Sequence, residues 1–257
     1  MKFFVIADTH SYYTPMITAL NEAGFDKTNP EHTLVVCGDS FDRGTQSVEV
    51  MEFLNSVERK VLIKGNHDDL LMELLNGRMP KPTDTHNGTT ETVFQLGYNA
   101  GTTKFSDYCI EAYRKYTPLY NQMVNYFETE NYIFVHSWIP TKEQPYNANT
   151  PDLTEMTFDE NWRDADEERW KVARWVNPYM FALAGLKPNK TIVFGHWHTS
   201  WPRARLYGGY EYTDKADFSI FYGDGYIGID AMTAYSGKIN VLVIEDTPIG
   251  NSPIEIS

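Results

Sequence analysis

The stretch Gly38-Asp39-Ser40-Phe41-Asp42-Arg43-Gly44 decides the fold, because it directly follows residues 33–37, an apolar run that predicts a buried strand. It places two carboxylates and one guanidinium at the end of that strand. A carboxylate such as Asp39 can bridge two cations, and the planar fork of Arg43 fits phosphate oxygens. The alternative is a solvated turn with an internal Asp–Arg pair. Other motifs in the chain are needed to distinguish a metal site from such a turn.

Four further motifs follow apolar runs in the same way. The runs at residues 2–7, 60–63, 132–135 and 191–194 precede, in this order, Asp8-Thr9-His10, Gly65-Asn66-His67-Asp68, His136 and Gly195-His196-Trp197-His198. Taken singly, an Asp-x-His turn can be a helix cap, and a lone histidine is more often a core residue. Five sets of oxygen and imidazole ligands after five strands predict a site for two metal ions, which can clamp both reacting oxygens of a phosphoryl transfer.

The same five runs indicate the fold class. They lack polar–apolar alternation, which is typical of strands buried on both faces. Helix-like segments at residues 14–23 and 47–56 separate the first three runs at the spacing of β-α-β units. We therefore expect an α/β fold with the ligands at the carboxyl ends of its strands.

The second half of the chain predicts two further features. Residues 218–222, 226–230 and 238–245 are strand-like and separated by turns at 223–225 and 235–237, which predicts a hairpin-rich second sheet. The intervals 69–131 and 139–188 carry helix-forming segments at 70–75, 105–126 and 164–175. We expect these intervals to be helical insertions over the active-site rim of one domain that spans residues 1–257.

Composition restricts the partners. The 257 residues include 22 Lys and Arg against 35 Asp and Glu, a net charge of −13. This disfavours long nucleic acids and anionic membranes, although a local basic pocket could hold one phosphate. With two cysteines, no run long enough to span a membrane and an apolar N-terminus too short for a signal peptide, we expect a cytoplasmic protein.

The five motifs together resemble those of the calcineurin-like metallophosphoesterase superfamily. The Asp42-Arg43-Gly44 form of the second motif is similar to the branch of phosphoprotein phosphatases and symmetrical diadenosine-tetraphosphate hydrolases. The resemblance implies an α/β/β/α sandwich of two packed mixed sheets flanked by helices. It also implies two divalent metal ions, for which Mn²⁺ is our first expectation and Fe or Zn²⁺ the alternatives.

The resemblance further implies a role for each motif residue. The first metal would be held by Asp8, His10 and Asp39, with His198 as an extra ligand, and the second by Asp39, Asn66, His136 and His196. His67 would be the general acid, oriented by Asp42, and Arg43 would bind the substrate phosphate. A hydroxide shared by the two cations would attack phosphorus in line.

Departures from the branch leave the substrate open. Lys64 and Asp68 stand where the branch commonly has Arg and Glu, and a lysine lacks the bidentate fork that grips a monoester dianion. The motif at residues 195–198 replaces Gly-His-Thr-Pro, and Ala231-Met232-Thr233 replaces Thr-Gly-Cys. Lys64 nevertheless remains a candidate for substrate binding beside Arg43.

A Trp- and Arg-rich segment at residues 162–175 offers one more candidate. Arg163, Trp170 and Arg174 follow helical spacing and could form a rim that stacks a nucleobase, with Arg174 binding the substrate. The alternative is a packed helix whose tryptophans lie in the core and whose arginines pair with acidic neighbours, Glu167 among them.

The leading functional hypothesis is a metal-dependent hydrolase of phosphate monoesters, including phosphoserine and phosphothreonine in proteins. The alternative enzyme is a dinucleoside polyphosphate hydrolase or a phosphodiesterase that acts on nucleotides. The expected partners are accordingly a phosphorylated small molecule, a nucleotide or a phosphoprotein. A non-catalytic metal-binding scaffold is disfavoured, because the chain retains every expected ligand.

Overall fold

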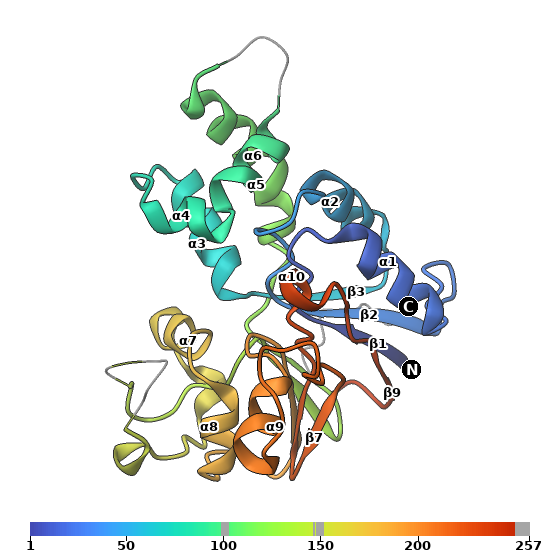
Figure 1. Cartoon of the computed structure of the whole chain (residues 1–257), viewed down its shortest axis with the longest axis vertical. Coiled ribbons are helices and arrows are strands. Elements are labelled where there is room, and N and C mark those ends of the chain that lie inside the picture. The colour runs from blue at the N-terminus through green and yellow to red at the C-terminus, as the bar shows by residue number, and fades with distance from the viewer. Residues whose placement is uncertain (99–102, 146, 148–151, 250–257) are drawn as a thin grey trace.

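The computed structural model describes residues 1–98, 103–145, 147 and 152–249, and two β-sheets lie at its centre (Figure 1). One sheet has the order β3-β2-β1-β9 and the other β4-β5-β6-β8-β7. The strands of the first sheet are β1 (Lys2–Ile6), β2 (His32–Cys37), β3 (Lys60–Ile63) and β9 (Leu242–Glu245). Those of the second are β4 (Phe127–Glu128), β5 (Tyr132–Phe134), β6 (Thr191–Phe194), β7 (Phe221–Gly223) and β8 (Tyr226–Gly228).

Three apolar layers hold the sheets and helices together, because successive residues of a strand point to opposite faces. Phe3 and Val5 of β1 pack between the sheets against the second sheet, for example Phe134. Phe4 and Ile6 face the other way, toward α1 (Tyr13–Glu22) and α2 (Ser47–Ser56). On the far side of the second sheet, Ile192 and Phe194 of β6 pack on α7 (Glu167–Ala173) and α8 (Pro178–Leu183).

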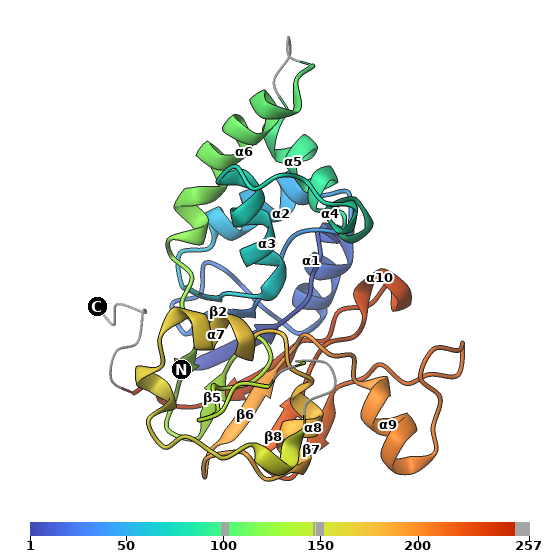
Figure 2. The ribbon, with the colours of Figure 1, turned by 90° about the vertical axis from the view of Figure 1, so that its left-hand side faces the viewer.

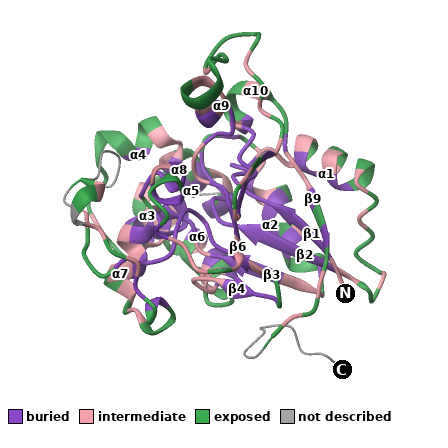
Figure 3. Ribbon diagram, turned by 90° about the horizontal axis from the view of Figure 1, so that it is seen from below, coloured by how far each residue is buried: buried purple, intermediate pink, exposed green. Residues whose placement is uncertain are grey.

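These layers confirm the predicted α/β/β/α sandwich, in which helices cover both outer faces of the sheet pair (Figures 1 and 2). Figure 3 shows the burial that produces it: the central strands are buried, and exposed residues gather on the outer helices. The strands expected at 2–7, 33–37, 60–63, 132–135 and 191–194 are all present within one or two residues of their expected ends.

The predicted hairpin around residues 235–237 is wrong. β8 lies in the second sheet, whereas β9 pairs antiparallel with β1 in the first. The intervening chain forms the short helix α10 (Thr233–Ser236), preceded by Met232 with φ 52°. Local sequence shows two apolar runs around a turn but not which sheet each run joins. The turn expected at 223–225 does connect an antiparallel pair, β7 and β8.

The interval 69–131 contains most of α3 (Asn66–Leu75) and all of α4 (Pro82–Asn87), α5 (Thr89–Gly97) and α6 (Phe105–Tyr120). The pair α5 and α6 extends away from the sheets (Figure 2). The interval 139–188 holds α7, α8 and two short 3₁₀ turns, and α9 (Ser200–Tyr207) follows β6. Within the described residues, none of the helices combines the length and apolar composition that crossing a bilayer requires.

Two helices begin at other residues than expected for identifiable reasons, and α6 ends at Tyr120 instead of residue 126. Helix α3 begins at Asn66 instead of residue 70, because the Asp68 carboxylate accepts a hydrogen bond from the Gly65 N–H at 2.8 Å and caps the first turn. Helix α7 begins at Glu167 instead of residue 164, because the Asp166 side chain caps it by accepting from the Arg169 N–H. The ligand motif at residues 65–68 is thus itself a helix start.

Candidate metal centre

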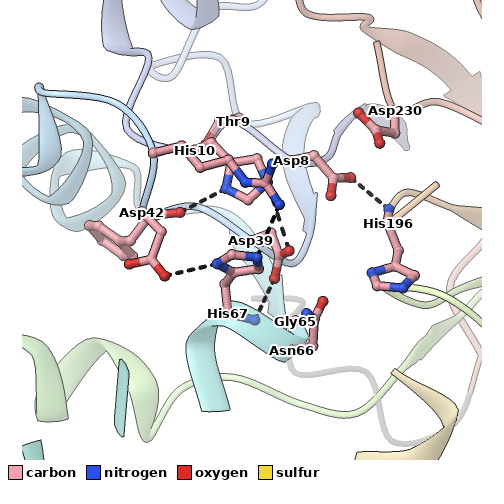
Figure 4. A network of polar contacts seen from close by, with 12 residues as sticks. Asp8, Thr9, His10, Asp39, Asp42, Gly65, Asn66, His67, His196 and Asp230 are labelled. Atoms are coloured by element: carbon pink, nitrogen blue, oxygen red, sulfur yellow. Dashed lines mark hydrogen bonds and ion pairs between the residues drawn. The ribbon is translucent and has the colours of Figure 1, made fainter. Parts of the chain in front are cut away.

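A cavity of about 320 Å³ opens where the ligand motifs meet, and the side chains that line it come from both sheets. Asp8 and His10 follow β1, Asp39 follows β2, and His196 follows β6. Asn66 and His67 form the first turn of α3. Figure 4 shows Asp39 at the centre of this group, with His10 and His67 on one side and His196 across from them.

The ligand loops have an unusual backbone conformation. Asp8, Asp39 and His196 have φ values of 52°, 52° and 63°, in the left-handed region that residues other than glycine seldom adopt. Such strain collects at functional sites, where the surrounding structure enforces it. Gly65 permits the close approach of the loops, since a Cβ there would lie 2.0 Å from the Asp39 Oδ1.

A first cluster consists of Asp39, His10 and His67, whose ligand atoms lie within 4.8 Å of one another. His10 Nδ1 donates to the Phe41 carbonyl at 2.9 Å, so Nε2 is the free acceptor, 3.8 Å from Asp39 Oδ2. Asp8 lies close by, and its Oδ2 accepts from the His196 backbone N–H at 2.8 Å. This side of the cavity brings together the three residues expected to hold the first metal.

A second cluster consists of Asp39, His136 and His196. His136 Nδ1 donates to the Cys37 carbonyl at 2.8 Å, which leaves Nε2 as an acceptor facing the Asn66 Oδ1 at 2.7 Å and Asp39 Oδ2 at 3.5 Å. His196 Nε2 is buried and finds no hydrogen-bond partner among the described residues. Acceptor atoms that converge without a donor fit a divalent cation, and an imidazole anchored through its other nitrogen is typical of metal ligation.

The electrostatics of the two clusters agree with this interpretation. Burial alone would raise the pKa of Asp39, but the imidazoles of His136, His67, His10 and His196 hold it below its usual range. Burial and the neighbouring His136 lower the pKa of His196 to about 3. An ionised Asp39 and a neutral His196 are the protonation states in which these two groups bind metal.

His67 and Asp42 form a second functional unit at the cavity. His67 Nδ1 lies 2.8 Å from Asp42 Oδ2, and the hydroxyls of Thr89 and Thr92 donate to the same carboxylate at 2.6 and 3.0 Å. Burial lowers the pKa of His67, but Asp39 and Asp42 raise it above its usual value. Arg43 lines the cavity with Nη2 3.3 Å from His67 Nε2. The imidazole of His67 and the guanidinium of Arg43 therefore stand side by side at the cavity wall.

His198 lines the cavity, but both of its ring nitrogens are engaged. Nδ1 lies 2.8 Å from Ser200 Oγ, and Nε2 lies 3.0 Å from Tyr212 Oη. Neither cluster of the described ligand residues includes it. Its role as an extra ligand for the first metal stays a prediction, and that role would require the Tyr212 hydroxyl to move away.

Lys64 and Arg174 do not line this cavity, so the structure does not place these two expected substrate-binding residues at it. Lys64 Nζ lies 3.4 Å from Glu167 and borders a separate cavity of about 540 Å³. The Arg174 guanidinium is buried and bonded to Asp69 and Glu167. Arg174 thus fits the packed helix with paired arginines better than a substrate-binding rim. Its guanidinium already pairs with two carboxylates.

The separate cavity also receives Arg163, which pairs with Glu128, and the buried Trp170. Of the residues in segment 162–175, Trp175 is therefore the one that could still stack on a nucleobase. It lines the metal cavity and is 37% exposed.

Several residues at the cavity were not predicted from the sequence. Asp230 lines the cavity, and burial raises its pKa to about 6. It follows β8 as the expected ligands follow their strands, so the same rule applied to the end of the chain would have predicted it. Asp68 accepts from the backbone N–H of Asp39 and from Tyr116 Oη. Asn87 and Tyr212 also line the cavity and carry no motif that signals this position.

Comparisons with known proteins agree with this geometry. The profile of the calcineurin-like phosphoesterase family matches residues 1–224. The asymmetrical bis(5′-nucleosyl)-tetraphosphatase of Bacillus velezensis is 32% identical over 136 residues, which cover 49% of this chain and 53% of that protein. The symmetrical bis(5′-nucleosyl)-tetraphosphatase of Coxiella burnetii is 34% identical over 92 residues, 36% of this chain and 30% of that protein. The chain thus spans about half or less of the length of these curated relatives.

The fold has a counterpart among solved structures. A putative diadenosine tetraphosphatase superposes with a TM-score of 0.52 at 17% identity, covering 98% of this chain and 95% of that chain. The cold-active protein-tyrosine phosphatase of a psychrophilic Shewanella superposes with a TM-score of 0.50 at 14% identity, covering 95% of this chain and 75% of that chain. At such identities the likeness concerns the fold.

Proposed function

Because the chain belongs to the calcineurin-like phosphoesterase family, we propose that it is a metal-dependent hydrolase of phosphoanhydride bonds in nucleotides, of the dinucleoside polyphosphate class. The observation that carries the proposal is the convergence of Asp39, Asn66, His136 and the unpartnered Nε2 of His196 beside the His67–Asp42 pair. The tetraphosphatases among the relatives support this substrate class over the phosphate monoesters expected first.

The cavity wall favours a nucleotide as well. Of the described residues that line the cavity, Arg43 is the single Lys or Arg, whereas Trp175, Trp197 and Tyr212 present aromatic rings. A single guanidinium would bind weakly to a substrate that offers a phosphate group and nothing else to recognise. An aromatic wall can stack on a nucleobase, which adds about 1–3 kcal/mol per base. The combination suits a phosphate chain attached to a nucleoside.

Each residue at the cavity has a defined task in this proposal. Arg43 binds a phosphoryl oxygen and orients the chain of phosphates. His67 gives its proton to the leaving oxygen, and Asp42 holds the ring in the required orientation. Two divalent cations, for which we propose Mn²⁺, supply charge neutralisation of the phosphoryl oxygens and activation of the attacking water when they are bound. Asp8, His10, Asp39, Asn66, His136 and His196 would hold them.

A substrate panel tests the proposal. Purified protein with Mn²⁺ is assayed on diadenosine tetraphosphate, a phosphoserine peptide, bis-p-nitrophenyl phosphate and 3′,5′-cyclic AMP, with the Asp39→Asn/His67→Gln variant as the background. We expect the highest kcat/KM on diadenosine tetraphosphate. Faster turnover of the phosphopeptide would restore the phosphoprotein hypothesis. Bound metal with no turnover above the background on any substrate would instead favour a non-catalytic scaffold.

The products add information that the rates do not contain. Cleavage to ATP and AMP is asymmetrical, and cleavage to two molecules of ADP is symmetrical. The relatives include both types, so chromatography of the products assigns the chain to one of them.

A further inference from the structure

Arg174 joins three chain segments through one buried guanidinium. Nε lies 2.7 Å from Asp69 Oδ2, Nη1 lies 2.8 Å from Asn125 Oδ1, and Nη2 lies 2.6 Å from Glu167 Oε1. The Arg174 side chain is 2% exposed and that of Asp69 is 7% exposed. We call these four residues the Arg174 network.

One end of the network is fixed to helix α3. Asp69 lies in the first turn of α3, directly after Asn66, His67 and Asp68, and its other carboxylate oxygen accepts from Tyr120 Oη at 3.1 Å. A shift of Asp69 would therefore rotate or slide the turn that carries Asn66.

The other end of the network is fixed to the segment that orients His196. Trp175 follows Arg174 directly, and its side chain lines the metal cavity beside the His196 imidazole. Its indole also lies edge-on to that ring, with 6.3 Å between the ring centroids. Val176 behind it is buried and its carbonyl accepts from Ser137 Oγ at 2.6 Å, so the segment has little freedom to move.

The two ends belong to different sheets. Helix α3 follows β3 of the first sheet, whereas His196 follows β6 of the second. Asn66 and His196 are both expected ligands of the second metal, and they meet only because the two sheets are aligned. Among the described residues, Asp8 and His10, which are expected to bind the first metal alone, form no hydrogen bond with the four residues of the Arg174 network, whereas Asp39 is shared by both clusters.

We propose that Arg174 is a positioning residue that fixes Asn66 relative to His196 and thereby sets the affinity of the second metal position. The inference rests on the metal centre proposed above. A buried ion pair is a costly way to gain stability, since apolar residues of similar volume often stabilise as well or better. The rigid fork of an arginine, however, holds several oxygens in one fixed geometry. The network thus fits a positioning task better than a stabilising one.

The test measures metal binding, not turnover. Metal-free wild-type protein and the Arg174→Met variant are titrated with Mn²⁺ by isothermal calorimetry, and free Mn²⁺ is counted by electron paramagnetic resonance. We expect two equivalents in the wild type. In the variant the first equivalent should bind as before, and the second should bind about 10- to 100-fold more weakly, as is usual when a supporting contact of a ligand is removed.

Arg169→Met is the matched control. Arg169 lies on α7, which ends directly before Arg174, and its Nη2 bonds Asp159 and the Thr141 carbonyl instead of α3. It should bind both equivalents as the wild type does. Arg174→Lys should recover part of the second affinity, because an ammonium can pair with Asp69 but cannot span three partners.

A further variant separates positioning from folding. Arg174→Met leaves the Asp69 carboxylate buried and unpaired, which destabilises the fold by itself. Asp69→Asn/Arg174→Met removes both charges, so it should regain stability against urea while its second equivalent remains weak. If both variants bind the second equivalent within twofold of the wild type, or if Arg169→Met loses it equally, the positioning role is overturned. A wild type that binds no Mn²⁺ would overturn the metal centre itself, and the inference with it.

Discussion

Asp42 and His67 form a buried pair in which the imidazole Nδ1 lies 2.8 Å from the carboxylate Oδ2. The same carboxylate accepts hydrogen bonds from the Thr89 hydroxyl at Oδ2 and from the Thr92 hydroxyl at Oδ1. Asp42, which does not itself line the cavity, therefore orients the His67 ring and, together with Asp39, raises the pKa of that ring.

The first prediction concerns this pair. Asp42→Asn should lower kcat on diadenosine tetraphosphate about 100-fold, within the range of general acid catalysis. Replacement of the nucleotide by a p-nitrophenyl ester provides the control, because a good leaving group needs little protonation and should lose much less. An equal loss on both substrates would contradict the assignment of His67 as the acid.

The pH dependence gives a second prediction with a defined sign. Burial lowers the pKa of His67, but Asp39 and Asp42 raise it above the usual value. The acid form is present below this pKa, so the rate should fall as pH rises through it. Asp42→Asn removes one of the raising charges, and the alkaline limb of the pH–rate profile should therefore move to lower pH. A limb that stays in place would assign it to another group.

Metal binding should stabilise the protein through Asp39, which both clusters share. A ligand whose free concentration is 100 times its dissociation constant adds about 2.7 kcal/mol to the free energy of unfolding. Thermal unfolding with Mn²⁺ and with a chelator should show a higher Tm with metal for the wild type and no difference for Asp39→Asn. Asp26→Asn, at an exposed turn far from the cavity, should keep the full difference.

Gly65→Ala should abolish activity through a steric effect. The new Cβ would stand 2.0 Å from Asp39 Oδ1, so the shared carboxylate has to move. Gly77→Ala is the control: its Cβ meets nothing within 4 Å, but its φ of +93° makes the substitution strained. We expect Gly77→Ala to lose stability and keep kcat, and Gly65→Ala to lose kcat even where it remains folded at low temperature.

Trp175 should contribute to nucleotide recognition. Its ring lines the cavity, and the loss of base stacking costs about 1–3 kcal/mol, so Trp175→Ala should raise the KM for diadenosine tetraphosphate about tenfold or more. Trp175→Phe should retain most of the affinity. Inorganic tripolyphosphate has no base to stack, and its KM should not change. A parallel rise on tripolyphosphate would mean that the cavity itself is distorted.

The expected ligands could be proposed from the sequence because each one follows an apolar run. Asp39 and His136 need only the rule that parallel strands deliver the residues after them to one edge. The supporting residues could not be found in this way. Thr92 contacts Asp42 across 50 residues of sequence, and Arg174 contacts Asp69 across 105. Helical spacing placed Arg174 on a face of α7 but contained no information about the helix opposite it.

The alignment of the two sheets has a consequence for how the protein acquires its metals. Asp8 and His196 are joined by a hydrogen bond across 188 residues of sequence, and the second cluster extends from Asp39 to His196. During synthesis, this cluster is incomplete until β6 has left the ribosome and docked beside β5. Loops of this length close late, since their closure entropy has to be offset by contacts already formed. A cation that needs Asp39, His136 and His196 together could therefore bind only after β6 has paired with β5.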